Sequence, residues 1–318
     1  MLSPFRFIAP PHSPFRADGQ LNLDAVASQV RLLEQHEVDG AFVAGTTGEV
    51  SSLTLDERKT LVEKWCDAAG DSEIEVIVQV GHNCQADACD LARHAQSAGA
   101  DAVAAFAPSY FKPAGIEELV EFLVPVAAAS GDLPFYFYDI PGMTGVRVPT
   151  AQLLSLAKER IPNLVGLKFS NNDLVTLQEC VRINDGEFEV LFGSDEVLLA
   201  GVAFGIAGAV GSTYNFATPL YRNMLAAFAA GNFDAARMLQ ARAVSLFRVL
   251  ERFGYLAASK ALMAMLGVDC GPVRTPLRNL AEPQIAELRR QLETLGFFRE
   301  SFFSESRSRV SADYEASL

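Results

Sequence analysis

The chain has 318 residues, a formal net charge of −13, and half of its residues are hydrophobic. This length allows one large or two ordinary domains, with a core that requires no disulfide or metal. The acidic balance argues against nucleic acid or an anionic membrane surface as a partner.

Short runs of β-branched and aromatic residues recur along the first two thirds of the chain and predict strands. In chain order, the expected strands are 5–9, 40–44, 75–80, 102–106, 135–138, 164–168, 190–192 and 209–211. Longer amphipathic runs between them predict helices. In chain order, the expected helices are 23–36, 55–69, 85–98, 116–130, 150–161, 173–184 and 196–204.

The alternation of strands and helices predicts a parallel sheet with right-handed crossovers. About eight such units over ~220 residues favour an α/β fold of the TIM (β/α)8 barrel type. An open doubly wound sheet is the alternative, but no GxGxxG motif follows the first strand.

The strand signal ends near Phe216, and the rest of the chain predicts a C-terminal helical extension. Helices are expected at 221–230, 233–252, 257–266 and 283–295, separated by glycines. We therefore expect a barrel with the active site at 1–220, a C-terminal helical region at 221–300, and a polar, disordered tail at 301–318.

The sequence shows no sign of export, membrane insertion or metal binding. No apolar run approaches the ~20 residues of a membrane span, and the N-terminus lacks the layout of a signal peptide. The five cysteines form no CxxC pair, and the four histidines show no HxH or HxxxH spacing. We expect a soluble, cytoplasmic protein without metal or other cofactor.

Lys168 ends the expected strand 164–168, where the active sites of barrels lie. Strand alternation puts Leu164, Gly166 and Lys168 on one face, and Gly166 is expected to leave room for a ligand. Burial lowers the pKa of a lysine amine from its ordinary value of ~10.4. The amine then loses its proton more readily and can act as a nucleophile. A lysine reaching to water is the alternative, and for a lysine taken alone it is the better explanation.

Tyr138 ends the preceding strand, 30 residues before Lys168. One βαβ unit of this length brings the two residues to neighbouring strand ends, ~5 Å apart. A phenol beside an amine can move protons during imine chemistry. Aromatic packing is the alternative for Tyr138 alone.

Three loops after strands carry polar residues. Thr46 and Thr47 lie in a Gly-Thr-Thr-Gly-Glu loop that suits a carboxylate, although an ordinary βα loop looks the same. Asp195 and Glu196 can bind hydroxyls, act as acid and base, or ligate a hard metal, but this segment can also cap the next helix. The loop 208–215 is an alternative phosphate site.

Three motifs in register resemble the dihydrodipicolinate synthase / N-acetylneuraminate lyase family. They are Gly45-Thr46-Thr47-Gly48-Glu49, Tyr138-Asp139-Ile140-Pro141 with Thr144-Gly145-Val146, and Gly166-Leu167-Lys168-Phe169-Ser170. The resemblance covers about 5–298. Met143 stands where the synthase has a carboxylate-binding arginine, and 193–196 is similar to the Gly-x-Asp-Glu motif of the lyase branch, to which the chain is most similar.

The resemblance implies roles for individual residues. Lys168 would form the Schiff base, Tyr138 would transfer protons, and Thr46 and Thr47 would bind the carboxylate, with Thr47 also orienting Tyr138. Tyr110 would be lent to a neighbouring subunit. Sugar-contacting positions are Ser170, Gly193, Asp195, Glu196 and Ser212. Ser170 and Ser194 differ from the Thr and Tyr that some lyases carry.

The implied activity is that of a class I aldolase, which cleaves N-acetylneuraminate into pyruvate and N-acetylmannosamine through a covalent imine. The implied assembly is a homotetramer made of two dimers. A related aldolase or dehydratase for a 2-keto-3-deoxy sugar acid is the first alternative. A phosphate-dependent barrel isomerase or epimerase and a non-catalytic sugar-acid sensor are more distant alternatives.

Overall fold

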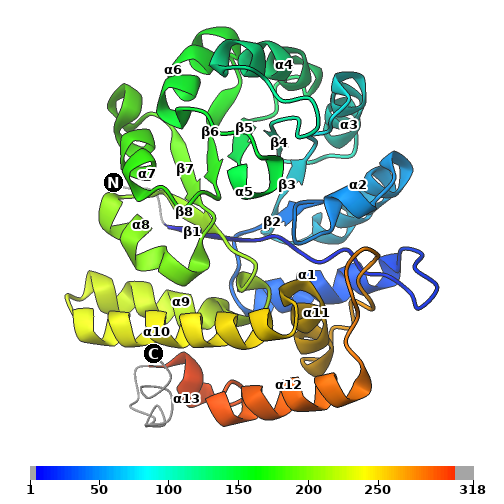
Figure 1. Cartoon of the computed structure of the whole chain (residues 1–318), viewed down its shortest axis with the longest axis vertical. Coiled ribbons are helices and arrows are strands. Elements are labelled where there is room, and N and C mark those ends of the chain that lie inside the picture. The colour runs from blue at the N-terminus through cyan, green and yellow to red at the C-terminus, as the bar shows by residue number, and fades with distance from the viewer. Residues whose placement is uncertain (1–4, 305–318) are drawn as a thin grey trace.

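A closed parallel barrel forms the centre of the molecule, in a computed structural model that describes residues 5–304. Its strands follow chain order around the barrel (Figure 1). They are β1 (Arg6–Ala9), β2 (Gly40–Val43), β3 (Glu75–Gln79), β4 (Ala102–Phe106), β5 (Phe135–Asp139), β6 (Leu164–Phe169), β7 (Glu189–Phe192) and β8 (Gly208–Val210). The expected barrel is confirmed, and each expected strand overlaps an observed one.

Helices surround the barrel and cover the outer face of its strands. They are α1 (Val26–Gln35), α2 (Leu55–Ala69), α3 (Gln85–Ser97), α4 (Ile116–Ala129), α6 (Thr150–Arg160), α7 (Leu174–Arg182), α8 (Leu198–Phe204) and α9 (Tyr214–Ala229). The short helix α5 (Pro141–Thr144) follows β5 and lies over the end of the barrel that faces the viewer in Figure 1. This end, where the strands finish, is called the mouth below.

Strand alternation divides the core into two layers. Ile8, Phe42, Ile77 and Leu191 are buried inside the barrel, while a larger apolar cluster fills the space between the strands and the helices. Burial on both faces explains why the strands read as nearly continuous apolar runs.

A polar cluster closes the barrel at the end opposite the mouth. Arg6 forms ion pairs with Glu75 and with Glu189, the second at 2.9 Å, and the Tyr136 hydroxyl donates to Glu189. The four residues come from alternate strands, so they form one layer across the barrel. The Tyr136 hydroxyl therefore belongs to this closing layer and not to the mouth, although Tyr136 and Tyr138 lie on the same face of β5.

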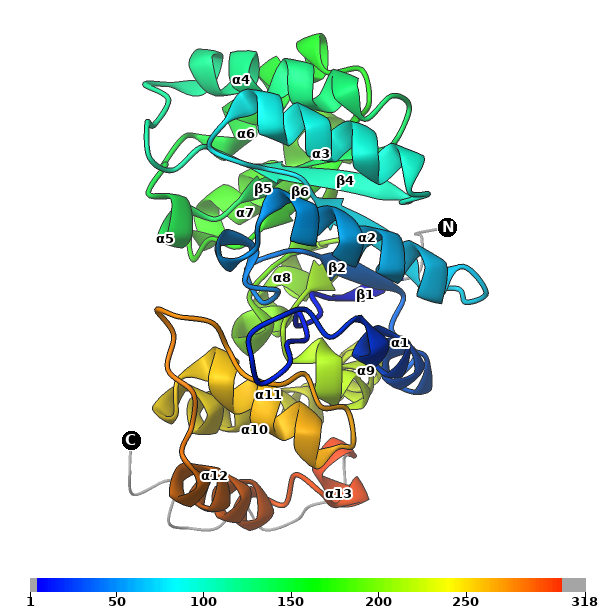
Figure 2. The same cartoon turned by 90° about the vertical axis from the view of Figure 1, so that its right-hand side faces the viewer.

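The C-terminal helices pack together on one side of the barrel, below it in Figures 1 and 2. They are α10 (Phe233–Arg252), α11 (Tyr255–Met265), α12 (Glu282–Leu295) and α13 (Glu300–Phe303). The boundary expected at residue 220 falls inside α9. The disorder expected from residue 301 is wrong for 301–303, because these residues belong to α13 and Phe302 is buried. The rest of the expected tail from residue 305 lies outside the described residues.

Helix α9 begins at Tyr214, earlier than the expected helix 221–230. Its first turns contain Pro219 and a kink at Ala217, whose φ of −136° is not helical. Proline inside a helix removes a backbone donor, which makes such a segment read as a loop. Tyr214 and Asn215 consequently lie in a helix and not in the loop after β8. Within residues 5–304, no helix has the length and apolar character needed to cross a membrane.

Candidate active site at the barrel mouth

Lys168 points into the barrel near the carboxyl end of β6 and is only 3% exposed. Its Nζ lies 3.6 Å from the ring centroid of Phe42 and 4.1 Å from that of Tyr138. The side chain is held between two aromatic rings and does not extend to bulk water. The alternative of a lysine reaching to solvent is therefore wrong.

Burial lowers the pKa of Lys168 well below its ordinary value, because the charged ammonium loses its hydration. The negative charge of Asp195 opposes this shift in part. A lowered pKa increases the fraction of lysine present as the free amine, which is the form that attacks a carbonyl carbon.

Tyr138 pairs in register with Lys168 across β5 and β6, as the 30-residue spacing predicts. Its hydroxyl lies 3.3 Å from the Thr46 hydroxyl oxygen, and its ring packs edge-on against Phe42 with centroids 5.3 Å apart. Burial raises the pKa of Tyr138, and hydrogen bonds with Thr46 and Ser170 offset part of the rise. The phenol therefore keeps its proton and can donate it to a reacting oxygen.

Gly166 serves packing and does not leave room for a ligand, so that expectation is wrong. A Cβ at this position would lie 2.2 Å from the backbone oxygen of Glu189 and 2.9 Å from the ring of Tyr136. The missing side chain lets β7 and Tyr136 approach β6, below the level of Lys168.

The loop after β2 is a tight turn that carries two threonines at the mouth end of the strand. Glu49 N–H donates to the Thr46 carbonyl at 3.0 Å, and Val50 N–H donates to the Gly45 carbonyl at 3.2 Å. Thr47 is buried, and Thr46 is the residue that contacts Tyr138. The contact expected between Thr47 and Tyr138 is thus made by Thr46 in this structure.

Ser170 and Gly193 lie against each other at the ends of β6 and β7. A Cβ at residue 193 would be 2.0 Å from the Ser170 hydroxyl oxygen, so glycine is needed there to admit the serine. The β6 and β7 loops therefore present their polar groups side by side, next to Lys168 and Tyr138.

Asp195 is buried and is fixed by the loop after β8. Its carboxylate accepts hydrogen bonds from the Thr213 hydroxyl and from Thr213 N–H, the latter at 2.9 Å. Ser194, at the start of the short helix Asp195–Val197, makes no capping hydrogen bond with its side chain. Helix capping therefore explains neither Ser194 nor Asp195, and the two loops are joined through Thr213.

Glu196 adds a second carboxyl group beside Asp195. Burial and the neighbouring charge of Asp195 raise the pKa of Glu196 to about 7, so this group titrates near neutrality. The Ser212 hydroxyl lies 2.6 Å from the hydroxyl of Tyr255, which comes from α11. The loops after β7 and β8 therefore bring hydroxyl and carboxyl groups together at the same end of the barrel as Lys168.

Tyr110 does not contribute to the mouth of its own chain. It is 78% exposed and packs edge-on against Phe111, which is also exposed, at a centroid distance of 5.0 Å. Met143 is also exposed, on α5.

Some residues that shape the site were not identified as site residues from the sequence. Phe42 covers Lys168, and its position facing the barrel interior could have been found from alternation in β2. Asp139 accepts hydrogen bonds from Thr150 and from Asn171, both at 3.1 Å, which ties together the loops that follow β5 and β6. Tyr255 carried no local signal, since its contact with Ser212 is tertiary.

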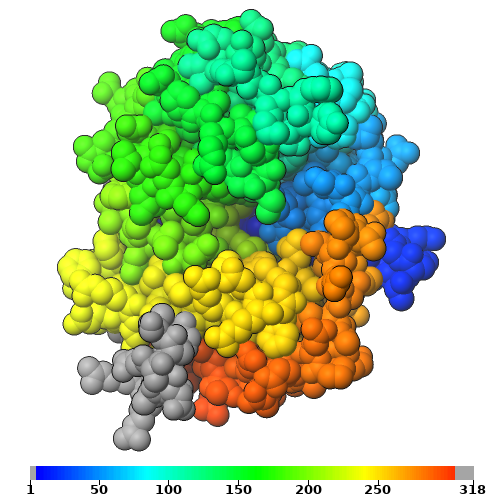
Figure 3. All heavy atoms as spheres, viewed as in Figure 1, coloured from blue at the N-terminus to red at the C-terminus, as the bar shows by residue number. Residues whose placement is uncertain are grey.

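The arrangement combines a buried amine, a phenol and a ring of polar groups at one end of the barrel. Figure 3 shows that this face of the molecule is hollowed between the barrel and the C-terminal helices. The chemistry available is imine formation at Lys168 with proton transfer at Tyr138. Among residues 5–304, no group of three or more His, Cys, Asp or Glu side chains is placed to hold a metal ion.

Comparisons with known proteins give consistent results. The model of the dihydrodipicolinate synthetase family matches residues 3–295. N-acetylneuraminate lyase from Danio rerio is 40% identical over 274 residues, which cover 85% of this chain and 89% of the relative. The lyase from Gallus gallus is 40% identical over 288 residues, which cover 89% of this chain and 93% of the relative. The solved structure of Proteus mirabilis N-acetylneuraminate lyase superposes with a TM-score of 0.90 at 35% identity, covering 92% and 99% of the two chains.

Proposed function

The chain belongs to the dihydrodipicolinate synthetase family, and we propose that it is a class I aldolase that cleaves N-acetylneuraminate into pyruvate and N-acetylmannosamine. The observation that carries this proposal is the pairing of buried Lys168 with Tyr138 at the barrel mouth. The similarity to N-acetylneuraminate lyases over most of the chain supports the choice of substrate.

The reaction begins with the open-chain 2-keto acid. Its carboxylate binds at the turn that carries Thr46 and Thr47, whose hydroxyl and backbone N–H groups are donors. The free amine of Lys168 attacks the C2 carbonyl carbon, and Tyr138 delivers a proton to the carbonyl oxygen. Loss of water then leaves a protonated imine on Lys168.

Cleavage follows because the protonated imine accepts the electron pair of the C3–C4 bond. Tyr138, as its phenolate after the first proton transfer, removes the proton of the C4 hydroxyl, and N-acetylmannosamine leaves as the aldehyde. The resulting enamine is protonated at C3, and hydrolysis of the imine releases pyruvate and restores Lys168. The scheme uses no metal or other cofactor.

The polar groups across the mouth are the proposed sites for the hydroxylated part of the substrate. Ser170 and Gly193 are adjacent to Lys168, and Asp195, Glu196 and Ser212 lie beyond them. Carboxylates fixed in position suit a polyol because each oxygen accepts a hydrogen bond from a hydroxyl.

Tyr110 is proposed to complete the site of a neighbouring subunit in a homotetramer. The support is its exposure together with Phe111, because two adjacent exposed aromatic rings favour burial against another chain. The cysteines within the described residues are free, which supports a reducing cytoplasmic setting.

The test measures pyruvate release from N-acetylneuraminate, coupled to lactate dehydrogenase, for wild type and Lys168→Ala. Release by wild type alone would establish both the reaction and the nucleophile. Release by both proteins would overturn the imine mechanism. Release by neither protein, with borohydride trapping of pyruvate on the wild-type Lys168, would replace N-acetylneuraminate by another 2-keto-3-deoxy sugar acid.

A further inference from the structure

A buried ion pair lies directly behind the carboxylate-binding turn and is not used in the mechanism above. The Glu49 carboxylate and the Lys260 ammonium are 2.7 Å apart, and their side chains are 1% and 2% exposed. Glu49 follows Thr46 and Thr47 in the turn after β2, whereas Lys260 lies in α11 of the C-terminal helices. The pair thus links the mouth of the barrel to a region far away in the sequence.

Glu49 has a strained backbone in this turn. Its φ of +54° is in the left-handed region, which is unfavourable for a residue with a side chain. Its N–H closes the turn on the Thr46 carbonyl, so the conformation of Glu49 determines how the two threonines face the mouth. Interactions of the Glu49 side chain must therefore hold the turn in this conformation.

The Lys260 ammonium contacts three separate segments of the chain. Besides Glu49, it donates to the Ser13 carbonyl at 2.9 Å and to the Pro272 carbonyl at 2.7 Å. The Ser13 hydroxyl in turn donates to the Gly48 carbonyl at 2.6 Å. One cation therefore fixes the turn through a carboxylate on one side and through the segment after β1 on the other.

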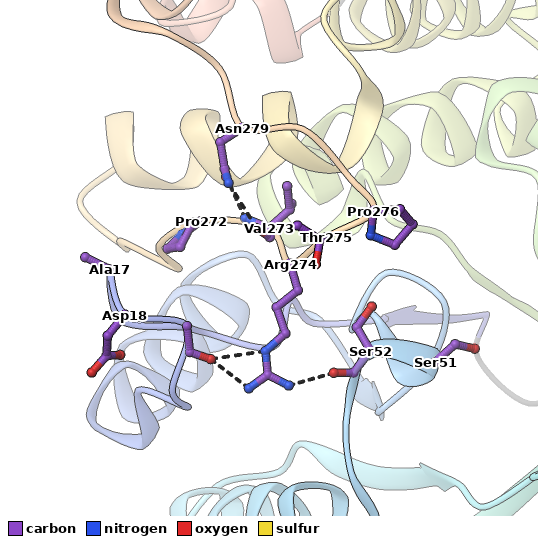
Figure 4. A pocket seen from close by; sticks show the side chains of 11 residues that line it. Ala17, Asp18, Ser51, Ser52, Pro272, Val273, Arg274, Thr275, Pro276 and Asn279 are labelled. Carbon is purple, nitrogen blue, oxygen red and sulfur yellow. Dashed lines mark hydrogen bonds between the residues drawn. The ribbon is translucent and has the colours of Figure 1, made fainter.

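The segment after α11 reinforces the same turn. Arg274 N–H donates to the second oxygen of Glu49 at 2.8 Å, and its guanidinium donates to the Ser52 and Gly19 carbonyls at 2.6 and 2.7 Å. Figure 4 shows this side chain reaching from the loop 272–279 to Ser52, beside a hollow of about 590 Å³. The C-terminal region thus contacts both the start and the end of the segment that follows Thr47.

We propose that Lys260 is a positioning residue for substrate binding, acting through Glu49 to hold Thr46 and Thr47 where they bind the keto-acid carboxylate. This inference rests on the proposed function, because it takes the turn as the carboxylate site. Thr46 also contacts Tyr138, so a shift of the turn moves a proton donor as well as a binding group. Misplacement of such groups by about 1 Å costs about a hundredfold in rate.

The variants are Glu49→Gln, Lys260→Met and the double variant. Lys260→Met alone leaves a buried carboxylate without its partner, which destabilises the fold strongly. The double variant removes both charges and so avoids the uncompensated buried charge. We expect it to be more stable than either single variant, which keeps the proposal testable if a single variant unfolds. Arg242→Met is the matched control, because Arg242 is a buried cation that donates to backbone carbonyls of 301–304.

The measurement is the pyruvate concentration needed for half-maximal borohydride trapping on Lys168, together with KM and kcat for N-acetylneuraminate and the melting temperature. We expect the double variant to fold but to need at least about tenfold more pyruvate for half-maximal trapping. Arg242→Met should melt at a lower temperature with an unchanged pyruvate requirement. A double variant with the wild-type pyruvate requirement and KM would overturn the positioning role and leave the aldolase assignment intact. Absence of trapping on wild-type Lys168 would overturn both.

Discussion

Replacing Tyr138 by phenylalanine separates the chemistry of the site from its packing. The ring that packs 4.1 Å from the Lys168 amine and against Phe42 remains, and only the hydroxyl that contacts Thr46 is removed. Because Thr46 is half-buried and keeps access to water, the free energy of unfolding should fall by about 1 kcal/mol or less. The fold and the lowered pKa of Lys168, which comes from burial, should both persist.

The effect on turnover should be far larger than the effect on stability. Loss of a positioned proton donor and acceptor lowers kcat about 10²- to 10⁴-fold, or ~3–5 kcal/mol in the barrier. Imine formation on Lys168 should remain detectable by borohydride trapping with pyruvate, because the amine itself is intact. The assay follows pyruvate release from N-acetylneuraminate at saturating substrate, with trapping measured in parallel.

Tyr136→Phe is the matched control for Tyr138→Phe. It lies on the same strand and the same face, but its hydroxyl contacts Glu189 in the layer that closes the opposite end of the barrel. This variant should lose stability and keep its kcat. If Tyr138→Phe retained more than a tenth of the wild-type kcat, or if both variants lost turnover equally, the assignment of proton transfer to Tyr138 would be refuted.

Two further predictions concern the polar side of the mouth and the packing below it. The pKa of Glu196 is raised from 4.5 to about 7. Between these two pH values the folded protein keeps a proton that the unfolded chain releases, so the free energy of unfolding falls as the pH rises through 7. Glu196→Gln should therefore melt above wild type at pH 8 and match it at pH 4, and an equal difference at both pH values would contradict this. Gly166→Ala should lose about 3 kcal/mol of unfolding free energy in urea, since its Cβ would lie 2.2 Å from the Glu189 carbonyl oxygen. Gly142→Ala, which meets nothing within 4 Å, should change stability by less than about 0.5 kcal/mol, and equal losses would refute the packing role of Gly166.

The barrel and the lysine–tyrosine pair could be predicted because their signals are local. Strands of a parallel barrel are buried on both faces, so each appears as a short apolar run between amphipathic helices. The register of Tyr138 with Lys168 follows from one repeat of that alternation. In contrast, periodicity shows which face of a strand a glycine lies on, but not which atoms of the neighbouring strands fill the space beside it. Gly166 was therefore expected to leave room for a ligand, although Glu189 and Tyr136 occupy that space.

Contacts between distant segments could not be predicted. Tyr255 reaches Ser212 from α11, and Lys260 reaches Glu49 from the same helix, although neither residue stands in a recognisable pattern. Helix α9 was placed too late because Pro219 and the kink at Ala217 disguise its first turns. These features are determined by packing, which overrides local preference.

The C-terminal helices contact the proposed active site on two sides and are not an appendage to a finished barrel. α11 supplies the phenol that contacts Ser212 on one side of the mouth and the ammonium that anchors the carboxylate turn on the other. Under the proposed function, one helix therefore contacts the turn proposed to bind the keto-acid head, at Thr46 and Thr47, and the loop that carries Ser212, which is proposed to contact the hydroxylated tail. A buried ion pair is a weak source of stability but a strong constraint on geometry, since separating its partners is costly. That constraint is what an aldolase needs behind a turn on which the substrate carboxylate must be placed before Lys168 can attack.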